Sequence, residues 1–264
     1  SWADVGVLKK GDNNEKAAYT KGLYARWSDR KHFGEVNFCR RLVGGLSKRA
    51  RQFDPEARVG FEGSGGFGMD FDELFANAGF WSPYDGIQTE IVRSLKPEGF
   101  VHSFWIGYST SADKLAARAW RAVINDAPSI WWWMLAGRGN YHGWLAPNNE
   151  PYPENRRFLD NVILPLRRGL GDLLTNLDYQ HDGIALYYSV GATHAGEIGA
   201  SAAFNSVRGA HASMLRLIED CGYQWVYTTK QRVLDGDLQK RNIRLLILPF
   251  TQALGANEVR ALRH

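Results

Sequence analysis

Aromatic side chains, carboxylates and a few polar donors recur in this sequence where apolar runs end and loops begin. Two glutamates, Glu62 and Glu90, could each act as a general acid, a general base or a nucleophile. The residues around them could stack on flat apolar ligand faces or hydrogen-bond to hydroxyl groups. These are Trp81, Tyr84, Asp85, Trp105, Tyr108, Trp133, Arg138, Tyr141, His142 and Trp144. Together they have the composition of a sugar-binding cleft, and they predict a carbohydrate ligand.

Each of the charged candidates also has a structural interpretation. Glu62 precedes the glycine-rich residues 63–68 and could lie in an open loop, but a salt bridge to an arginine of a neighbouring unit would explain it equally well. Glu90 falls in the first turn of an expected helix, where the helix dipole favours a carboxylate. Asp85 could cap a turn, and His142 could be an ordinary hydrogen-bonded loop residue. The sequence leaves these alternatives open.

The elements that must position these residues alternate between short apolar runs and helical patterns. A helix over 33–52 comes first, and Asp54-Pro55 ends it. After it we expect strands at 57–62, 79–85, 100–107 and 129–135, separated by helices at 71–78, 88–95 and 112–124. This alternation predicts a parallel sheet, whose nearly apolar strands suit burial on both faces. In a (β/α) barrel the carboxyl ends of the strands form the ligand site, which would bring the candidate residues together.

A second α/β region follows an amphipathic helix at 161–177 and a turn-rich linker at 178–183. Strands are expected at 184–189, 224–227 and 243–249, with a helix at 210–221, a pattern consistent with a doubly wound fold. We therefore predict two domains, 1–177 and 178–264. The chain begins as if inside a fold and stops inside a helix that starts near Asn257, so we expect it to be part of a longer protein.

Composition excludes several classes of protein. The 264 residues are 44% hydrophobic and 23% charged, as in ordinary globular domains rather than disordered chains. The net charge of +4 is spread over helical patterns without a basic, aromatic-interleaved track, so no nucleic-acid partner is expected. Cys39 and Cys221 are far apart and predict free thiols, and no apolar run is long enough for a membrane helix. No metal or other cofactor is expected, and localisation is left open.

Five short motifs, taken in order, resemble the family 42 type of β-galactosidase. They are Asp54-Pro55 before a strand, Ser-Pro-Tyr-Asp at 82–85, Tyr-Ser-Thr-Ser at 108–111, the Trp-rich run at 131–133 and Leu-Pro-Phe-Thr-Gln-Ala-Leu at 248–254. The resemblance covers nearly the whole chain. It implies strands five to eight of a (β/α)8 TIM barrel, followed by a partial flavodoxin-like domain that mediates trimer formation.

The same resemblance raises a difficulty for catalysis. Family members are retaining glycosidases that use two carboxylates. The acid/base, a Glu preceded by Asn, would lie upstream, and Asn14-Glu15 is not its match because its surroundings have turn composition. The nucleophile position is occupied by Gly107. We therefore expect a glycosidase acting on β-galactosides or related saccharides with Glu62 or Glu90 as substitute, or an inactive glycan-binding or scaffold protein; assembly alone is a third possibility.

Overall fold

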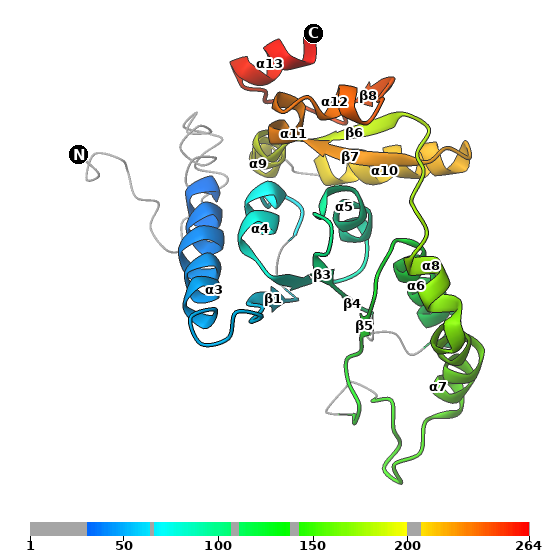
Figure 1. Ribbon diagram of the computed structural model, residues 1–264. Helices are drawn as coiled ribbons and strands as arrows, with labels where there is room; N and C mark the ends of the chain where they lie inside the picture. Colours follow the sequence, from blue (N-terminus) through cyan, green and yellow to red (C-terminus); the bar gives the residue numbers. More distant parts are fainter. Residues whose placement is uncertain (1–30, 64–65, 107–110, 138–142, 200–206, 264) are drawn as a thin grey trace. The chain divides into compact units, whose positions relative to one another are not determined.

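The computed structural model describes residues 31–63, 66–106, 111–137, 143–199 and 207–263 (Figure 1). The chain divides into two compact units. The central unit contains Val43–Gly66 and Phe75–Gln180. The C-terminal unit contains Phe67–Leu74 and the described parts of Ser1–Leu42 and His181–His264. The two predicted domains, 1–177 and 178–264, stay a prediction.

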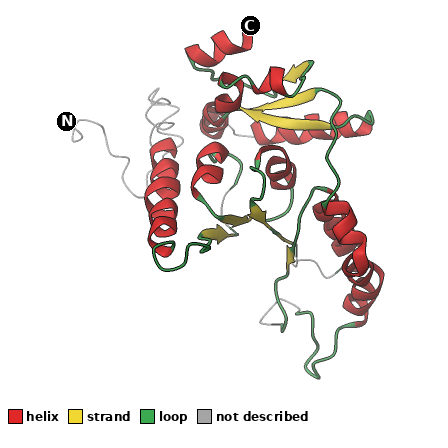
Figure 2. Ribbon diagram, in the orientation of Figure 1, coloured by secondary structure: helices red, strands yellow, loops and turns green. Residues whose placement is uncertain are grey.

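Both units are mixed α/β structures in which all paired strands are parallel (Figure 2). In the central unit, strands β1 (Gly60–Glu62), β2 (Phe80–Ser82) and β3 (Val101–His102) form one sheet in that order. Strands β4 (Phe104–Trp105) and β5 (Ile130–Trp131) form a second sheet. The expected βα order and the parallel pairing are thereby confirmed for the described residues.

One expected strand is divided in two. The run 100–107 becomes β3 and β4, which are separated by Ser103. The Ser103 hydroxyl donates to the Ser82 hydroxyl at 2.7 Å, and the Ser103 N–H donates to the Trp81 carbonyl at 3.3 Å. A parallel bridge between Tyr84 and Trp105 continues the pairing beyond this point. The chain of β2 therefore borders both sheets.

Amphipathic helices cover the strands of the central unit. Helix α5 (Ile87–Leu95) buries Ile91, Val92 and Leu95. Helix α6 (Ala112–Ile124) is preceded by its N-cap residue Ser111, whose hydroxyl accepts from the Lys114 N–H. Helix α6 packs against α7 (Pro153–Phe158), π-helical segment η2 (Leu159–Ile163) and α8 (Gly171–Thr175), as Figure 1 shows. The helical stretch starts at Pro153, earlier than expected, because proline suits the first turn of a helix.

Residues 31–36 are helical, and they are followed by the π-helical segment η1 (Asn37–Val43) and by helix α3 (Gly44–Ala50). Together these segments confirm the helix expected at 33–52. Another π-helical segment, η3 (Leu166–Leu170), precedes α8. Helix α4 (Phe71–Asn77) is also confirmed, although its residues are divided between the two units.

The C-terminal unit is built on strands β6 (Ile184–Tyr188), β7 (Trp225–Thr229) and β8 (Leu245–Ile247), in the order β7-β6-β8. The chain thus moves to one side of β6 and then to the other. Because parallel crossovers are right-handed, such a reversal places the connecting helices on opposite faces of the sheet. Helices α9 (Val190–Gly199) and α10 (Val207–Asp220) connect β6 to β7, and helices α11 (Lys230–Leu234) and α12 (Asp237–Lys240) connect β7 to β8. Helix α13 (Ala256–Arg263) follows β8.

Every residue of β6 and β7 is buried, as expected for a sheet covered on both faces. Tyr188 of β6 also anchors the segment Phe67–Leu74: its hydroxyl accepts from the Gly68 N–H at 2.6 Å and donates to the Met69 carbonyl at 3.0 Å. The ring of Phe71 packs on Tyr188 at 5.1 Å. These contacts explain why this segment groups with strands more than a hundred residues away in sequence.

Candidate functional site

The carboxyl ends of the parallel strands in the central unit meet along one edge. Glu62 ends β1 and lies in register with Ser82, which ends β2. Trp105 of β4 is in register with Trp131 of β5 and is bridged to Tyr84. Parallel pairing therefore collects the strand-end residues at a common edge, where (β/α) proteins bind their ligands.

Three tryptophans at this edge form an aromatic wall, defined here as Trp105, Trp131 and Trp133. The ring centroids of Trp105 and Trp131 are 5.2 Å apart with an interplanar angle of 77°, and those of Trp105 and Trp133 are 6.4 Å apart at 63°. Such edge-to-face contacts hold aromatic rings in defined orientations. Trp131 is 37% exposed and Trp133 is 43% exposed, so the wall presents ring surface to solvent.

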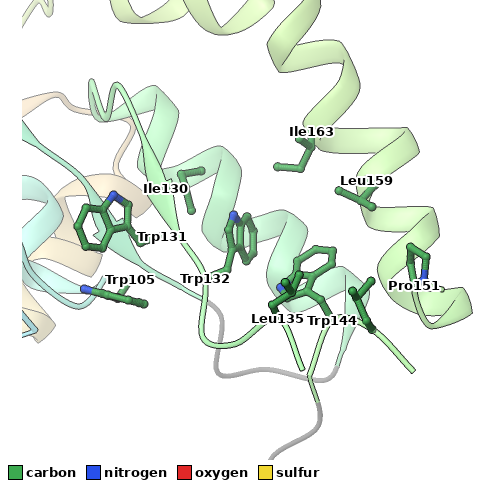
Figure 3. A pocket seen from close by; sticks show the side chains of 10 residues that line it. Trp105, Ile130, Trp131, Trp132, Leu135, Trp144, Pro151, Leu159 and Ile163 are labelled. Carbon is green, nitrogen blue, oxygen red and sulfur yellow. The ribbon is translucent and has the colours of Figure 1, made fainter. Parts of the chain in front are cut away.

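A cavity of about 550 Å³ adjoins the aromatic wall (Figure 3). Trp105 and Trp131 line it from the strands, and Leu159 and Ile163 line it from segment η2. The other lining residues are Ile130, Trp132, Leu135, Trp144, Leu145 and Pro151. The volume falls in the usual range for small-molecule sites, and the walls are almost wholly apolar.

A second aromatic group fixes the floor of this cavity. Trp132 packs edge to face on Trp144 at 5.0 Å and on Phe158 at 5.0 Å. The backbone N–H of Trp144 donates to the Met134 carbonyl at 2.9 Å, and Asn155 donates to the Trp144 carbonyl at 3.0 Å. The predicted ligand residue Trp144 is therefore held against the residues that follow β5 by both backbone and ring contacts.

The described residues that line the cavity offer ring surface and few hydrogen-bonding groups. The indole Nε1 of Trp105 is buried and has no hydrogen-bond partner among the described residues, so it could donate to a ligand oxygen. Aromatic faces pair well with the C–H faces of sugar rings. The arrangement suits a ligand that is flat, apolar on one face and able to accept a hydrogen bond at its rim.

Glu62 is exposed at the end of β1, and the Gly63 N–H that follows it donates to the Ser82 carbonyl at 2.8 Å. Gly63 has a φ of +61°, and a Cβ there would lie 3.4 Å from the Tyr84 hydroxyl. Tyr84, itself 43% exposed, therefore borders the turn that carries Glu62. The structure thus brings two of the predicted site residues to adjacent strand ends.

Glu90 has a different environment. Its side chain is 1% exposed, and Arg121 donates from Nε to Glu90 Oε1 at 3.0 Å, with a second hydrogen bond from Nη2. Burial raises the pKa of Glu90, and the attraction of Arg121 opposes that rise. This enclosed ion pair joins α5 to α6. The Glu90 carboxylate is therefore not open to the carboxyl edge of the strands.

Asp85 and Trp81 are also tied to the protein. Arg118 binds both carboxylate oxygens of Asp85 and donates to the Ile106 carbonyl at 3.4 Å. The Asp85 carboxylate therefore orients Arg118, as bidentate pairs do. Trp81 is fully buried and packs against Phe61 and Phe75, which places it in the hydrophobic core.

Four predicted ligand residues, Tyr108, Arg138, Tyr141 and His142, lie outside the described residues, as does Gly107. Sequence reasoning missed Trp131, Trp132 and Leu135 as cavity residues. A period of two along β5 and the residues after it could have grouped Trp131 with Leu135, which are both exposed, but it could not have found the half-buried Trp132.

No group of His, Cys, Asp and Glu in the described part of the chain could hold a metal ion. Within the same residues, no helix is both long enough and apolar enough to cross a bilayer. Cys39 is buried, Cys221 is exposed, and both are free thiols.

Comparison with known proteins gives a structural match. The fold is similar to that of a β-galactosidase from the psychrophilic Marinomonas ef1, with a TM-score of 0.58 at 13% sequence identity, over 82% of this chain and 40% of that one. The chain has a glycoside hydrolase-like fold. It spans less than half the length of that β-galactosidase.

A second solved structure is a GH5_18 protein from Streptomyces cattleya in complex with Manb1-4GlcNAc, with a TM-score of 0.44 at 16% identity over 67% of this chain and 51% of that one. No protein-family model and no curated protein sequence matches the chain.

Proposed function

We propose that this chain forms the carbohydrate-binding side of a family 42-like glycoside hydrolase acting on β-galactosides or related oligo- and polysaccharides. The aromatic wall at the carboxyl edge of the parallel strands is the observation that carries this proposal. Trp105, Trp131 and Trp133 expose ring surface beside a cavity of about 550 Å³. The fold shared with a β-galactosidase and the ordered sequence motifs support the same assignment.

In this proposal the strands of the central unit are the second half of a (β/α)8 barrel, and hydrolysis follows the retaining mechanism. A retaining site needs one carboxyl group to protonate the leaving group and another, about 5–5.5 Å away, to attack the anomeric carbon. Glu62 is the candidate of this chain for the attacking group, because it is exposed at a strand end. Glu90 fits a structural role better, because Arg121 neutralises it inside the protein.

The alternative is a glycan-binding or scaffold protein without hydrolytic activity. Of the strand-end carboxylates proposed from the sequence, Asp85 is bound by Arg118 and Glu90 by Arg121. In this alternative the stacking rings bind sugars without cleaving them. Gly107 at the position of the family's nucleophile favours this alternative.

For the C-terminal unit we propose a flavodoxin-like fold that serves trimer formation. The order β7-β6-β8, with reversal at β6, supports the first part. Trimer formation rests on the sequence resemblance alone. Sedimentation equilibrium of the full chain measures it, and a monomer at all concentrations contradicts it.

Hydrolysis and binding by the full chain distinguish the two functions. Aryl β-galactosides and a panel of oligosaccharides serve as substrates, and intrinsic tryptophan fluorescence reports binding. Trp131→Ala and Trp133→Ala should each weaken binding about fivefold, because stacking contributes on the order of 1 kcal/mol per ring. Tyr223→Ala is the control, since Tyr223 is 52% exposed and belongs to the C-terminal unit.

Glu62→Gln separates catalysis from binding. If Glu62 attacks the substrate, the variant loses hydrolysis and retains binding. Binding by the unaltered chain without turnover on any substrate supports the glycan-binding alternative. Absence of both binding and turnover, with circular dichroism showing an intact fold, contradicts the carbohydrate proposal altogether.

A further inference from the structure

A polar cleft of about 400 Å³ lies in the central unit between helix α3 and the last residues of helix α4. Two of its side chains are the cations Lys48 and Arg51, and no Asp or Glu is among the described residues that line it. Its other walls are Gly44, Ser47, Gln52, Ala76 and Asn77. The cleft shares no residue with the aromatic cavity, and its chemistry is the opposite: cationic and rich in hydrogen-bond donors.

Ser47 provides an unusual group in this cleft. The residue is 5% exposed, and its Oγ has no hydrogen-bond partner among the described residues. A serine inside a helix commonly bonds to a carbonyl of the preceding turn, which Ser47 does not do. Buried hydroxyls are normally satisfied, so a ligand oxygen that accepts from Ser47 would supply the hydrogen bond that the described residues do not.

The side chains of Lys48 and Arg51 do not cap the carboxyl end of their own helix. The carbonyl of Ser47 accepts from the Arg51 N–H at 3.0 Å, and that of Ala50 accepts from the Phe53 N–H at 2.9 Å. The last turn of α3 is therefore capped by backbone groups. Arg51 donates from Nε to the Ala57 carbonyl at 3.4 Å, whereas its two Nη atoms and the Lys48 ammonium have no partner in the part of the chain that the structure describes.

Gln52 adds a further donor. Its Oε1 accepts from Arg49 Nη1 at 2.5 Å, which leaves the amide Nε2 to donate. Residues that carry a hydroxyl, an amide and two cationic groups thus line one cleft, and no carboxylate is among its described lining residues. Donor-rich, doubly cationic surroundings select an anion with several acceptor oxygens.

We propose that this cleft binds a small tetrahedral oxyanion of the phosphate type, with Lys48 and Arg51 balancing its charge and Ser47 and Gln52 donating to its oxygens. The proposal goes beyond the carbohydrate function and does not depend on it. The ligand could be free phosphate or a phosphate group carried by a sugar, and the two present the same oxygens to the cleft.

Isothermal titration calorimetry of the full chain with inorganic phosphate tests the proposal, with sodium chloride at equal ionic strength as reference. We expect saturable binding, and a loss of affinity of at least tenfold in the double variant Lys48→Gln, Arg51→Gln. The matched control, Arg156→Gln with Arg157→Gln, removes the same charge from exposed positions on α7 and should leave the affinity unchanged. A hexose 6-phosphate distinguishes the sources: tighter binding than inorganic phosphate indicates a sugar phosphate, and equal binding indicates the free ion.

Ser47→Ala provides a variant that does not risk unfolding, because it removes a buried hydroxyl that has no described partner. It should weaken phosphate binding several-fold without lowering the melting temperature. Three outcomes would overturn the proposal: no saturable binding at millimolar phosphate, the same heat from chloride, or equal loss of affinity in the control variant.

Discussion

The indole rings of Trp105 and Trp131 meet edge to face, 5.2 Å between centroids, on two parallel strands that are paired in register at these very residues. The backbone hydrogen bonds of the strand pair thus fix the geometry of the ring pair. Because β4 and β5 are each two residues long, the ring contact adds to a small number of backbone hydrogen bonds between them.

Trp131→Phe should therefore be milder than Trp131→Ala. An edge-to-face pair contributes about 1 kcal/mol beyond the area that it buries, and phenylalanine keeps a ring in this position whereas alanine keeps none. Urea unfolding followed by circular dichroism measures the difference. Equal stability of the two variants would show that the ring contact does not stabilise the strand pair.

The buried pair of Glu90 and Arg121 predicts a non-additive response. Arg121→Met leaves the Glu90 carboxylate buried without its cation, which should lower the free energy of unfolding by about 2 kcal/mol, less than a fully enclosed pair would lose because Arg121 is 47% exposed. The double variant Glu90→Gln, Arg121→Met should recover part of this loss at pH 7, since no buried charge remains. If the losses of the single variants simply add, the pair is not coupled.

The same pair makes a prediction about pH. Burial raises the pKa of Glu90 even with Arg121 present, and removal of Arg121 removes the attraction that opposes this rise. The deficit of Arg121→Met relative to the unaltered chain should therefore shrink as the pH falls and Glu90 takes up a proton. Unfolding curves at neutral and mildly acidic pH measure this, and a deficit independent of pH contradicts it.

Two buried histidines predict a loss of stability in mild acid. Burial lowers the pKa of His102 to about 4 and that of His211 to about 3. Both pKa values are depressed relative to the unfolded chain, whose histidines titrate near 6.5, so protons bind the unfolded state first. Stability is complete above about pH 6.5 and falls as the pH drops toward 4, by up to about 1.4 kcal/mol per pH unit for each histidine.

Denaturant midpoints measured across this range test the prediction. His211→Gln should flatten the decline, because the variant has no imidazole at this position to protonate in the unfolded state. Replacement of His32, whose side chain is 52% exposed, is the control, because it leaves both buried imidazoles in place. A decline of equal steepness in His211→Gln would contradict the assignment.

Two glycines provide a matched test of close packing. A Cβ at Gly60 would lie 2.0 Å from the Phe80 carbonyl oxygen, so Gly60→Ala should force β1 away from β2 and cost on the order of 3 kcal/mol. Gly45 has no atom within 4 Å of such a Cβ, and it lies within α3. Gly45→Ala should instead stabilise the protein by about 0.5–1 kcal/mol through helix propensity. Urea denaturation of both variants checks the opposite signs.

Local patterns predicted most of the elements around the candidate site. Apolar runs punctuated by glycine and proline placed β1, β2 and β5, and the period of helix α6 was visible before its cap at Ser111 was known. The helix start at Pro153 also has a local signal, because proline is favoured at the first position of a helix. The division of β3 from β4 had none, because it depends on a hydroxyl contact between Ser103 and Ser82 on a neighbouring strand.

The sequence by itself determined that strands and helices alternate, because hydrophobic period and turn residues act within a few positions of the chain, and alternation requires parallel strands with a common carboxyl edge. Only the tertiary structure decided which side chains are available at that edge. Trp81 and Trp133 have similar places near strand ends, yet one is enclosed by Phe61 and Phe75 and the other is 43% exposed. Exposure and ion pairing depend on partners distant in sequence, as Arg121 is from Glu90, and no local pattern contains them.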